Sequence, residues 1–299
     1  MMTFKAAFRY ELLASSRSRS PQLIVSVFLL LTSISSLIGW LTVRNVTKIY
    51  DDIVSQKLTS ASNPFSGVSA LYYMRDSVIY TVLVGSLMAI VLGAQTSLRD
   101  RKSSADVLIR TRNVHLLSRA LGQLSALGAI IAGLEAATLA SSIFTIWTIQ
   151  KIPLRFASLI HLLSFGAISG LLMLAIAALG FVFGIFARTE ESALLYPIVT
   201  WAFITFTVPQ IITSTHPVAL LNPTPAIAIG TGLAQSMVNT ISPFMLMEHF
   251  KSIANSLLGI DSSLKLSSTS ILSFAGFVLL ALIGSILVSA NVIGKKLNV

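Results

Sequence analysis

One acidic residue lies deep inside an apolar stretch of the sequence. Glu135 is the only ionisable side chain in the run from Leu121 to Trp147. A carboxyl group inside a membrane is costly unless it is paired or hydrated, so it is a candidate proton relay, cation site or hydrogen-bond partner of a neighbouring helix. The sequence offers no second Asp, Glu, Lys or Arg at a similar depth. Structural pairing, or a polar face in a transient cavity, is therefore the favoured interpretation.

A basic stretch from Leu98 to Arg119 separates two apolar runs. It reads LRDRKSSADVLIRTRNVHLLSR and contains six of the 21 Lys and Arg residues of the chain. Two acids, Asp100 and Asp106, are interleaved with these bases. Such a stretch is either a solvated positive loop on the cytoplasmic side of a membrane or a docking element for a partner.

Motifs for hydrolysis and nucleotide binding are absent from the sequence. There is no HExxH, and in GAISG (Gly166–Gly170) the serine stands fourth, so GxSxG is not met. A soft metal site around Met245 and His249 is disfavoured, because the methionines there end an apolar run. No GxxxxGK[ST] occurs, so ATP, if used, is held with Mg²⁺ by another polypeptide. The chain is predicted to be no enzyme, with no cofactor or metal of its own.

The composition requires a membrane environment for these residues. Hydrophobic residues make up 54% of the 299 residues and charged residues only 11%, whereas about a quarter of a soluble domain is charged. The net charge of +10 follows from bases that hold loops in the cytoplasm, so nucleic acid is not expected as a partner. The expected partner surface is the lipid bilayer.

Six apolar runs are long enough to cross a bilayer, which takes about 20 residues. The sequence therefore predicts an all-α membrane protein, one transmembrane domain over residues 1–299. The amphipathic pattern of residues 1–20, with Phe4 and Phe8 beside Lys5 and Arg9, predicts an interfacial helix, the alternative being a frayed basic tail. The predicted spans are Leu23–Val43, Val78–Gln95, Leu121–Trp147, Ala157–Phe186, Ala193–Ile212 and Thr269–Ile293.

Small residues recur at helical spacing in two spans. Gly128, Ala132, Ala136 and Ala140 form a ladder in the third span, and the fourth span carries two glycine pairs, Gly166 with Gly170 and Gly180 with Gly184. Such residues allow close approach of helix backbones in a membrane. The third span is therefore expected to lie buried among its neighbours.

The regions between spans are expected to be mostly irregular. Arg44–Ser77 and Glu248–Ser268 are interpreted as polar loops. Residues 217–258 are apolar but interrupted by Pro, Gly and Asn, which favours two short re-entrant or interfacial helices on the outer side over an additional pair of spans. Pro197 and Pro209 are expected to kink the fifth span.

Charge counting orients the chain. Six spans put both termini on one side, with thirteen of the Lys and Arg residues, against eight on the other side. The side with more bases is predicted to be cytoplasmic. His161 near the outer end of the fourth span is interpreted as interfacial.

The order of these elements resembles the permease subunits of type-2 ABC transporters, the ABC-2 family. In that family the segment after the second span has mixed charges, small residues, an acid and a hydrophobic triplet, as in Asp100-Arg101-Lys102, Ser103-Ser104-Ala105, Asp106 and Val107-Leu108-Ile109. A looser likeness joins Ser242-Pro243-Phe244, His249-Phe250 and Gly259-Ile260-Asp261 to the outer segment before the last span. The family's turn usually contains Gly, where this chain has Ser103 and Ser104.

This resemblance implies a permease that dimerises, as a homodimer or heterodimer, and binds two cytosolic ABC ATPase subunits. It implies an exporter in the plasma membrane of a prokaryote, with export of an amphiphile, drug, lipid or peptide as the default. Residues 98–119 then form the cytosolic coupling segment. The residues that the resemblance assigns to ATPase coupling are Asp100, Arg101, Lys102, Asp106, Leu108, Arg110 and Arg112.

A second hypothesis needs no partner ATPase. A stand-alone secondary transporter or channel would use Glu135 as its intramembrane polar site. An intramembrane hydrolase, by contrast, lacks a serine or metal constellation in the sequence.

Overall fold

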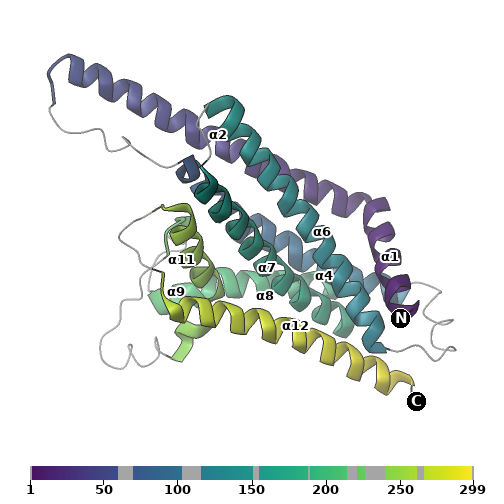
Figure 1. Cartoon of the computed structure of the whole chain (residues 1–299). Coiled ribbons are helices and arrows are strands. Elements are labelled where there is room, and N and C mark those ends of the chain that lie inside the picture. Colours follow the sequence, from purple (N-terminus) through teal and green to yellow (C-terminus); the bar gives the residue numbers. More distant parts are fainter. Residues whose placement is uncertain are drawn as a thin grey trace.

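The computed structural model of the chain describes residues 2–59, 70–102, 116–150, 155–187, 189–213, 221–225, 240–260 and 266–297 (Figure 1). All regular structure in these ranges is helical, and they contain no strand. Within these described ranges six helices are long and apolar enough to cross a membrane, which confirms the predicted all-α, multi-pass class. These are Val25–Ser55, Leu71–Arg99, Leu117–Thr148, Phe156–Phe186, Glu190–Ile211 and Ser268–Ala290.

Several of these spans combine more than one helical element. The second and fifth each contain a π-helical turn, and the third ends in one. Pro197 lies inside the fifth span and removes one backbone donor before its π turn. The elements are α1 (Met2–Arg17), α2 (Arg19–Ser55), η1 (Ala70–Met74), α3 (Arg75–Tyr80), η2 (Thr81–Gly85), α4 (Ser86–Lys102), α6 (Leu116–Thr145), η3 (Ile146–Gln150), α7 (Phe156–Phe186), α8 (Glu190–Ala202), η4 (Phe203–Thr207), α9 (Val208–Thr213), η6 (Ser242–Phe244), α11 (Leu246–Leu258) and α12 (Ser268–Leu297).

The tightest contact of the bundle is the seam between α4 and α7. A Cβ atom at Gly93 would lie 1.9 Å from the Ala177 carbonyl oxygen, and one at Gly180 would lie 2.0 Å from the Ile90 carbonyl oxygen. Gly184 approaches the Ala94 carbonyl oxygen in the same way, at 2.7 Å. The helices therefore touch backbone to backbone, and the close packing expected of Gly180 and Gly184 is confirmed.

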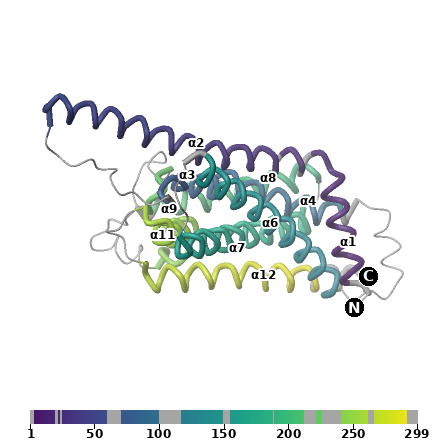
Figure 2. Tube along the Cα trace, turned by 45° about the horizontal axis from the view of Figure 1, so that its top comes forward, coloured from purple at the N-terminus to yellow at the C-terminus, as the bar shows by residue number. Residues whose placement is uncertain are grey.

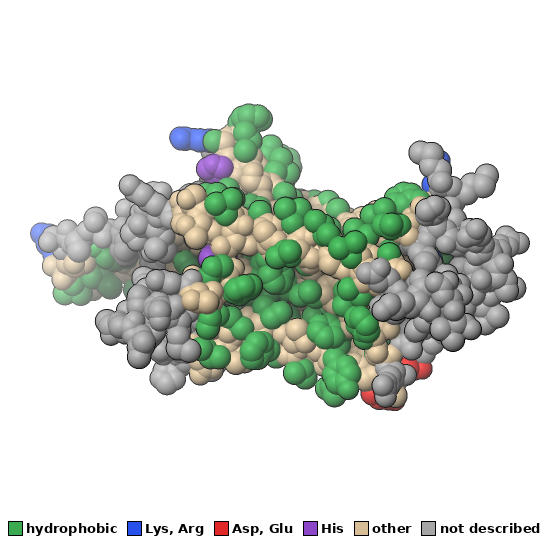
Figure 3. Space-filling view, turned by 90° about the horizontal axis from the view of Figure 1, so that it is seen from below, with side chains coloured by type: hydrophobic (Ala, Val, Ile, Leu, Met, Phe, Trp, Pro, Cys, Tyr) green, Lys and Arg blue, Asp and Glu red, His purple; other side chains and the backbone are tan. Residues whose placement is uncertain are grey.

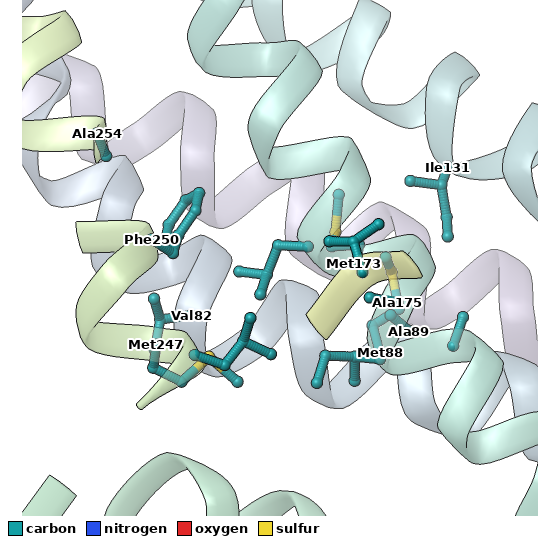
Figure 4. Close-up of a cluster of buried hydrophobic side chains, with 14 of the residues drawn as sticks. Val82, Met88, Ala89, Ile131, Met173, Ala175, Met247, Phe250 and Ala254 are labelled. Atoms are coloured by element: carbon teal, nitrogen blue, oxygen red, sulfur yellow. The ribbon is translucent and has the colours of Figure 1, made fainter. Parts of the chain in front are cut away.

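The other helices surround this seam. In both views of the bundle α2 and α12 lie on opposite sides, and the two termini lie at the same end (Figures 1 and 2). The core joins side chains of α4, α6, α7 and α11, among them Met88, Ile131, Met173 and Phe250 (Figure 4). The face seen in Figure 3 is hydrophobic or uncharged across its middle, as expected for contact with lipid.

The first span is longer than predicted. The interpretation of Arg44–Ser77 as a polar loop is wrong at both ends. The helix α2 continues to Ser55, 37 residues in all, and η1 and α3 make residues 70–77 helical, so the second span begins at Leu71 and not at Val78. A helix need not end where its apolar run ends, and no Gly or Pro between Trp40 and Asn63 interrupts this one. It ends two residues before Lys57, whose φ of 59° is left-handed. Arg44 also stacks on the Trp40 ring, 5.2 Å from its centroid.

The helix α11 shows that the interpretation of Glu248–Ser268 as a polar loop is wrong for its first part. It runs from Leu246 to Leu258, lies largely buried against α7 and α12, and ends at Gly259, whose φ of 63° is left-handed. The αL glycine after Leu258 is a common helix stop. For residues 217–258 the structure therefore has one buried helix at the end; residues 214–220 and 226–239 lie outside the described residues, so the predicted outer re-entrant helices stay a prediction.

Most of the small-residue ladder of α6 is not covered by another helix. Ala132, Ala136 and Ala140 are exposed, and a Cβ atom at Gly133 would meet nothing within 4 Å. The expectation that this ladder lies buried among its neighbours is therefore wrong within the chain. The buried face of α6 is instead the one with Leu127, Ile131 and Leu134, because larger side chains bury more apolar area.

Candidate functional site

The predicted coupling segment begins at the end of α4. Asp100, Arg101 and Lys102 form the last residues of this helix. The other four predicted coupling residues, Asp106, Leu108, Arg110 and Arg112, lie outside the described residues. The structure therefore describes the two flanks of the segment, the end of α4 and the start of α6.

A partly buried ion pair fixes the flank on α4. Arg99 Nη2 donates to Glu11 Oε1 of α1 at 2.7 Å and to Ser15 Oγ at 3.0 Å. The Thr96 hydroxyl donates to the same Glu11 oxygen at 3.0 Å. The Glu11 side chain is 1% exposed and that of Arg99 is 23% exposed. Removing one partner of such a pair leaves the other charge without compensation, which makes the pair a strong positional constraint.

The same helix α1 also covers the flank on α6. A Cβ atom at Gly122 would lie 2.8 Å from the Phe4 carbonyl oxygen and 2.9 Å from the Ala7 Cβ atom. Only glycine allows this approach of α1 to the first turns of α6. One amphipathic helix thus holds both ends of the residues that connect α4 to α6. We call this arrangement, made by Glu11, Ser15, Thr96, Arg99 and Gly122, the α1 clamp.

The sequence contains one signal for the clamp, the position of Glu11. Glu11 lies on the same face of α1 as the half-buried Phe8 and Leu12, where a hydrophobic residue would be expected. An acid on the apolar face of an amphipathic helix indicates a basic partner. Arg99 and the buried Arg119 were counted among six bases of one stretch, but neither is a fully solvated loop residue. Charge counting alone does not separate paired bases from free ones.

Glu135 lies in the middle of α6, where it faces α7. The residue is 6% exposed, and its Oε1 atom is buried without a hydrogen bond from any residue that the structure describes. Its Cγ atom lies 3.6 Å from the position of a Cβ atom at Gly170. The predicted structural pairing of Glu135 is therefore not found within the described ranges.

A hollow surrounds this carboxyl group. It has a volume of about 340 Å³ and is bounded by α6 and α7. Its walls are apolar apart from Glu135, with the small-residue ladder on one side and the first glycine pair of α7 on the other. The lining residues are Gly128, Ile131, Ala132, Glu135, Ala136, Leu139, Gly166, Ala167, Gly170, Leu171 and Leu174.

A second group of buried polar residues lies on α11. Lys251 Nζ donates to Glu248 Oε1 at 2.7 Å, and both side chains are buried. The His249 ring nitrogen Nε2 lies 2.8 Å from the Ser242 carbonyl oxygen. Burial lowers the pKa of His249, although the Ser242 hydrogen bond and the Glu248 charge act in the opposite direction. The described residues contain no group of three His, Cys, Asp or Glu side chains that could hold a metal ion.

His161 occupies an exposed position in the first turns of α7. This position, near the end of the span, agrees with an interfacial role.

Comparisons with known proteins leave the family open. No protein-family model matches the sequence, and no curated protein matches it. Function must therefore be argued from the α1 clamp, the Glu135 hollow and the six spans.

Proposed function

We propose that this chain is the transmembrane permease subunit of an ABC transporter, which moves a substrate with ATP hydrolysed by a separate ATPase subunit. The observation that carries the proposal is the α1 clamp. A docking segment transmits motion only if both of its ends are attached rigidly to the helices that must move. The ion pair between Glu11 and Arg99 attaches one flank of residues 98–119, and the contact of α1 with Gly122 attaches the other.

The charges of the segment suit a role in docking. Arg101 and Lys102 lie two and three residues after Arg99, at the end of α4 where the clamp holds the backbone. Arg99 is engaged with Glu11, and on this proposal the bases that follow it in the sequence would meet the partner. Complementary charges steer association and fix register more than they add affinity. On this proposal the side with both termini is cytoplasmic, since it carries the larger share of Lys and Arg.

The finer features of the proposal come from the resemblance to ABC-2 permeases. They are a permease dimer, an exporting direction, location in a prokaryotic plasma membrane, and short re-entrant helices on the outer side before the last span. ATP and Mg²⁺ would be bound by the partner, since the sequence has no phosphate loop.

Charge reversal of Arg101 and Lys102 tests the docking role. The chain would be purified with an ATPase that carries a phosphate loop and is encoded beside it or co-purifies with it, and ATP hydrolysis would be measured for the complex in liposomes. We expect Arg101→Glu with Lys102→Glu to abolish the effect of the permease on ATP hydrolysis, because the reversed charges repel the partner surface. Membrane insertion and thermal unfolding should not change.

A matched double reversal controls for net charge. Lys48→Glu with Lys57→Glu makes the same change at the opposite end of the molecule, where both side chains are exposed. This variant should couple like the unmodified chain. Unchanged coupling in the Arg101 and Lys102 variant would instead support a solvated positive loop.

Glu135 favours a second candidate function, a stand-alone secondary transporter or channel. Its carboxyl group is buried in α6 and has no partner among the described residues, as a group that exchanges a proton or cation would require. The two candidates separate in liposomes that contain the purified chain alone. Uptake or release of substrate without ATP, abolished by Glu135→Gln, would support the second candidate and refute the first.

A further inference from the structure

We propose that the hollow between α6 and α7 is a binding site for a cationic amphiphile that enters from the lipid and places its ammonium group on Glu135. We call this site the Glu135 groove, defined by Ile131, Glu135 and Leu139 of α6 with Gly166, Gly170 and Leu174 of α7. It goes beyond the proposed function, since it requires no ATPase.

The depth of the groove comes from missing side chains. Gly170 lies opposite Glu135 and Ile131, and even an added Cβ atom there would be at ordinary contact distance, 3.6 Å and 3.9 Å from their side chains. On the α6 side the wall is made by alanines and Gly128. The space of about 340 Å³ is within the range of small-molecule sites.

The groove opens toward the outside of the bundle. Ala132 and Ala136 of α6 and Ala167 and Leu171 of α7 form its rim, and all four are exposed. Both helices are membrane spans, so this rim faces the hydrocarbon region. A ligand therefore reaches the groove from the bilayer, which requires a largely apolar molecule.

The carboxyl group sets the charge of the ligand. Glu135 makes no ion pair or hydrogen bond with the described residues, and only 6% of the residue is exposed. A carboxylate in this environment is strongly disfavoured unless a cation compensates it. An ammonium group supplies both the charge and the hydrogen-bond donors, which gives a stronger contact than a neutral hydroxyl group would.

The ends of the groove favour a small molecule over the helix of a second copy. The Leu139 side chain reaches within 2.6 Å of a Cβ position at Gly166 and closes one end. Leu174 lies beside Gly128, at 3.8 Å from its Cβ position, and bounds the other end. A docked helix needs a continuous strip of small residues, as the α4–α7 seam has. Between Gly128 and Leu139 the groove spans about 16 Å of helix.

Photolabelling of the purified full chain in phosphatidylcholine liposomes tests the site. The probe is a ten-carbon alkylamine with a diazirine near its far end, and its neutral match is the alcohol of the same length. We expect saturable labelling by the amine, mapped by peptide mass spectrometry to residues 128–139 and 166–174 and displaced by excess decylamine. Labelling by the alcohol should stay at background.

Two variants distinguish recognition from partition into lipid. Glu135→Gln keeps the shape of the site and removes the charge, so we expect amine binding to weaken about tenfold or more. Gly170→Leu keeps the carboxyl group and fills the groove, and it should prevent labelling. Glu190→Gln, at an exposed acid on α8, should label like the unmodified chain.

Three results would overturn the proposal. Equal labelling by the amine and the alcohol would show that the groove takes any alkyl chain, and unchanged labelling of Glu135→Gln would remove the carboxyl group from the site. The chain has no cysteine, so a single introduced cysteine can form a disulfide only with the same residue of a second copy. Formation of a disulfide between two copies of Ala136→Cys in the membrane would assign this face to a dimer. None of these results would bear on coupling to an ATPase, which is tested separately through Arg101 and Lys102.

Discussion

The helix α7 carries the same small-residue spacing on two stretches, with opposite results. Gly180 and Gly184 close on α4 until backbones touch, whereas Gly166 and Gly170 leave a hollow against α6. The difference lies in the facing helix. On α4 the opposite positions are backbone and small residues, such as Gly93 and Ala94. On α6, Leu139 and Ile131 stand between the helices. Small residues on one helix permit close approach, and the partner decides whether it occurs.

The largest loss of stability is expected from a substitution in the closed seam between α4 and α7. Gly180→Ala places a Cβ atom 2.0 Å from the Ile90 carbonyl oxygen, and backbone cannot rotate away as a side chain can. The helices must separate, which should destabilise the fold by about 3 kcal/mol or more. The midpoint of thermal unfolding in detergent measures this loss. A folded variant with an unchanged midpoint would show that the seam is looser than described.

A smaller loss of stability is expected at the α1 clamp, which joins α1 to the end of α4 and the start of α6. Glu11→Gln removes the charge that compensates Arg99 and should cost about 1–3 kcal/mol. Because the seam does not depend on α1, hydrogen exchange should rise in α1 and in the first turns of α6 but not in the middle of α4 or α7.

The surface ion pair of Arg75 and Asp76 controls for the loss of an acid. Both side chains are 38% exposed, so Asp76→Asn should change stability by less than about 1 kcal/mol. An equal rise of hydrogen exchange in the middle of α4 and in the first turns of α6 after Glu11→Gln would contradict a selective role of the clamp.

The smallest change in stability is expected from a substitution in the open hollow between α6 and α7. Gly170→Ala adds a Cβ atom at ordinary contact distance from Glu135 and removes a flexible residue from a helix. Stability should stay constant or rise by up to about 1 kcal/mol, the gain of alanine over glycine in a helix. The unfolding midpoint compared with that of Gly180→Ala measures the contrast within one helix. A loss as large as that of Gly180→Ala would show that the hollow closes in the folded protein.

The sequence predicted the spans better than their contacts. Runs of about 20 apolar residues suffice to place six membrane helices, because the bilayer sets their length. The helix ends depend on stop signals, which explains why α2 extends to Ser55 past its apolar run. The partner of a small-residue face is not encoded in that face. For this reason Gly180 was predicted correctly as a close contact, and Ala132 and Ala136 were not.

The polar residues show the same limit. Glu135 could be singled out because its neighbours in sequence are apolar, but the absence of a partner required the structure. Glu11 and Arg99 are 88 residues apart, and no local pattern connects them. Only the position of Glu11 on an apolar helix face indicated that a partner was needed.

The distance along the chain between Glu11 and Arg99 also orders events during synthesis. At roughly 5–20 residues per second, the ribosome adds the 88 residues from Leu12 to Arg99 in roughly 4–18 s. During that interval Glu11 of α1 cannot form its ion pair, because Arg99 has not yet been synthesised. The amino-terminal helix must therefore wait at the membrane surface until the second span has been inserted. The clamp therefore forms only after the second span has been made, and a chain truncated before residue 99 should leave α1 accessible to protease.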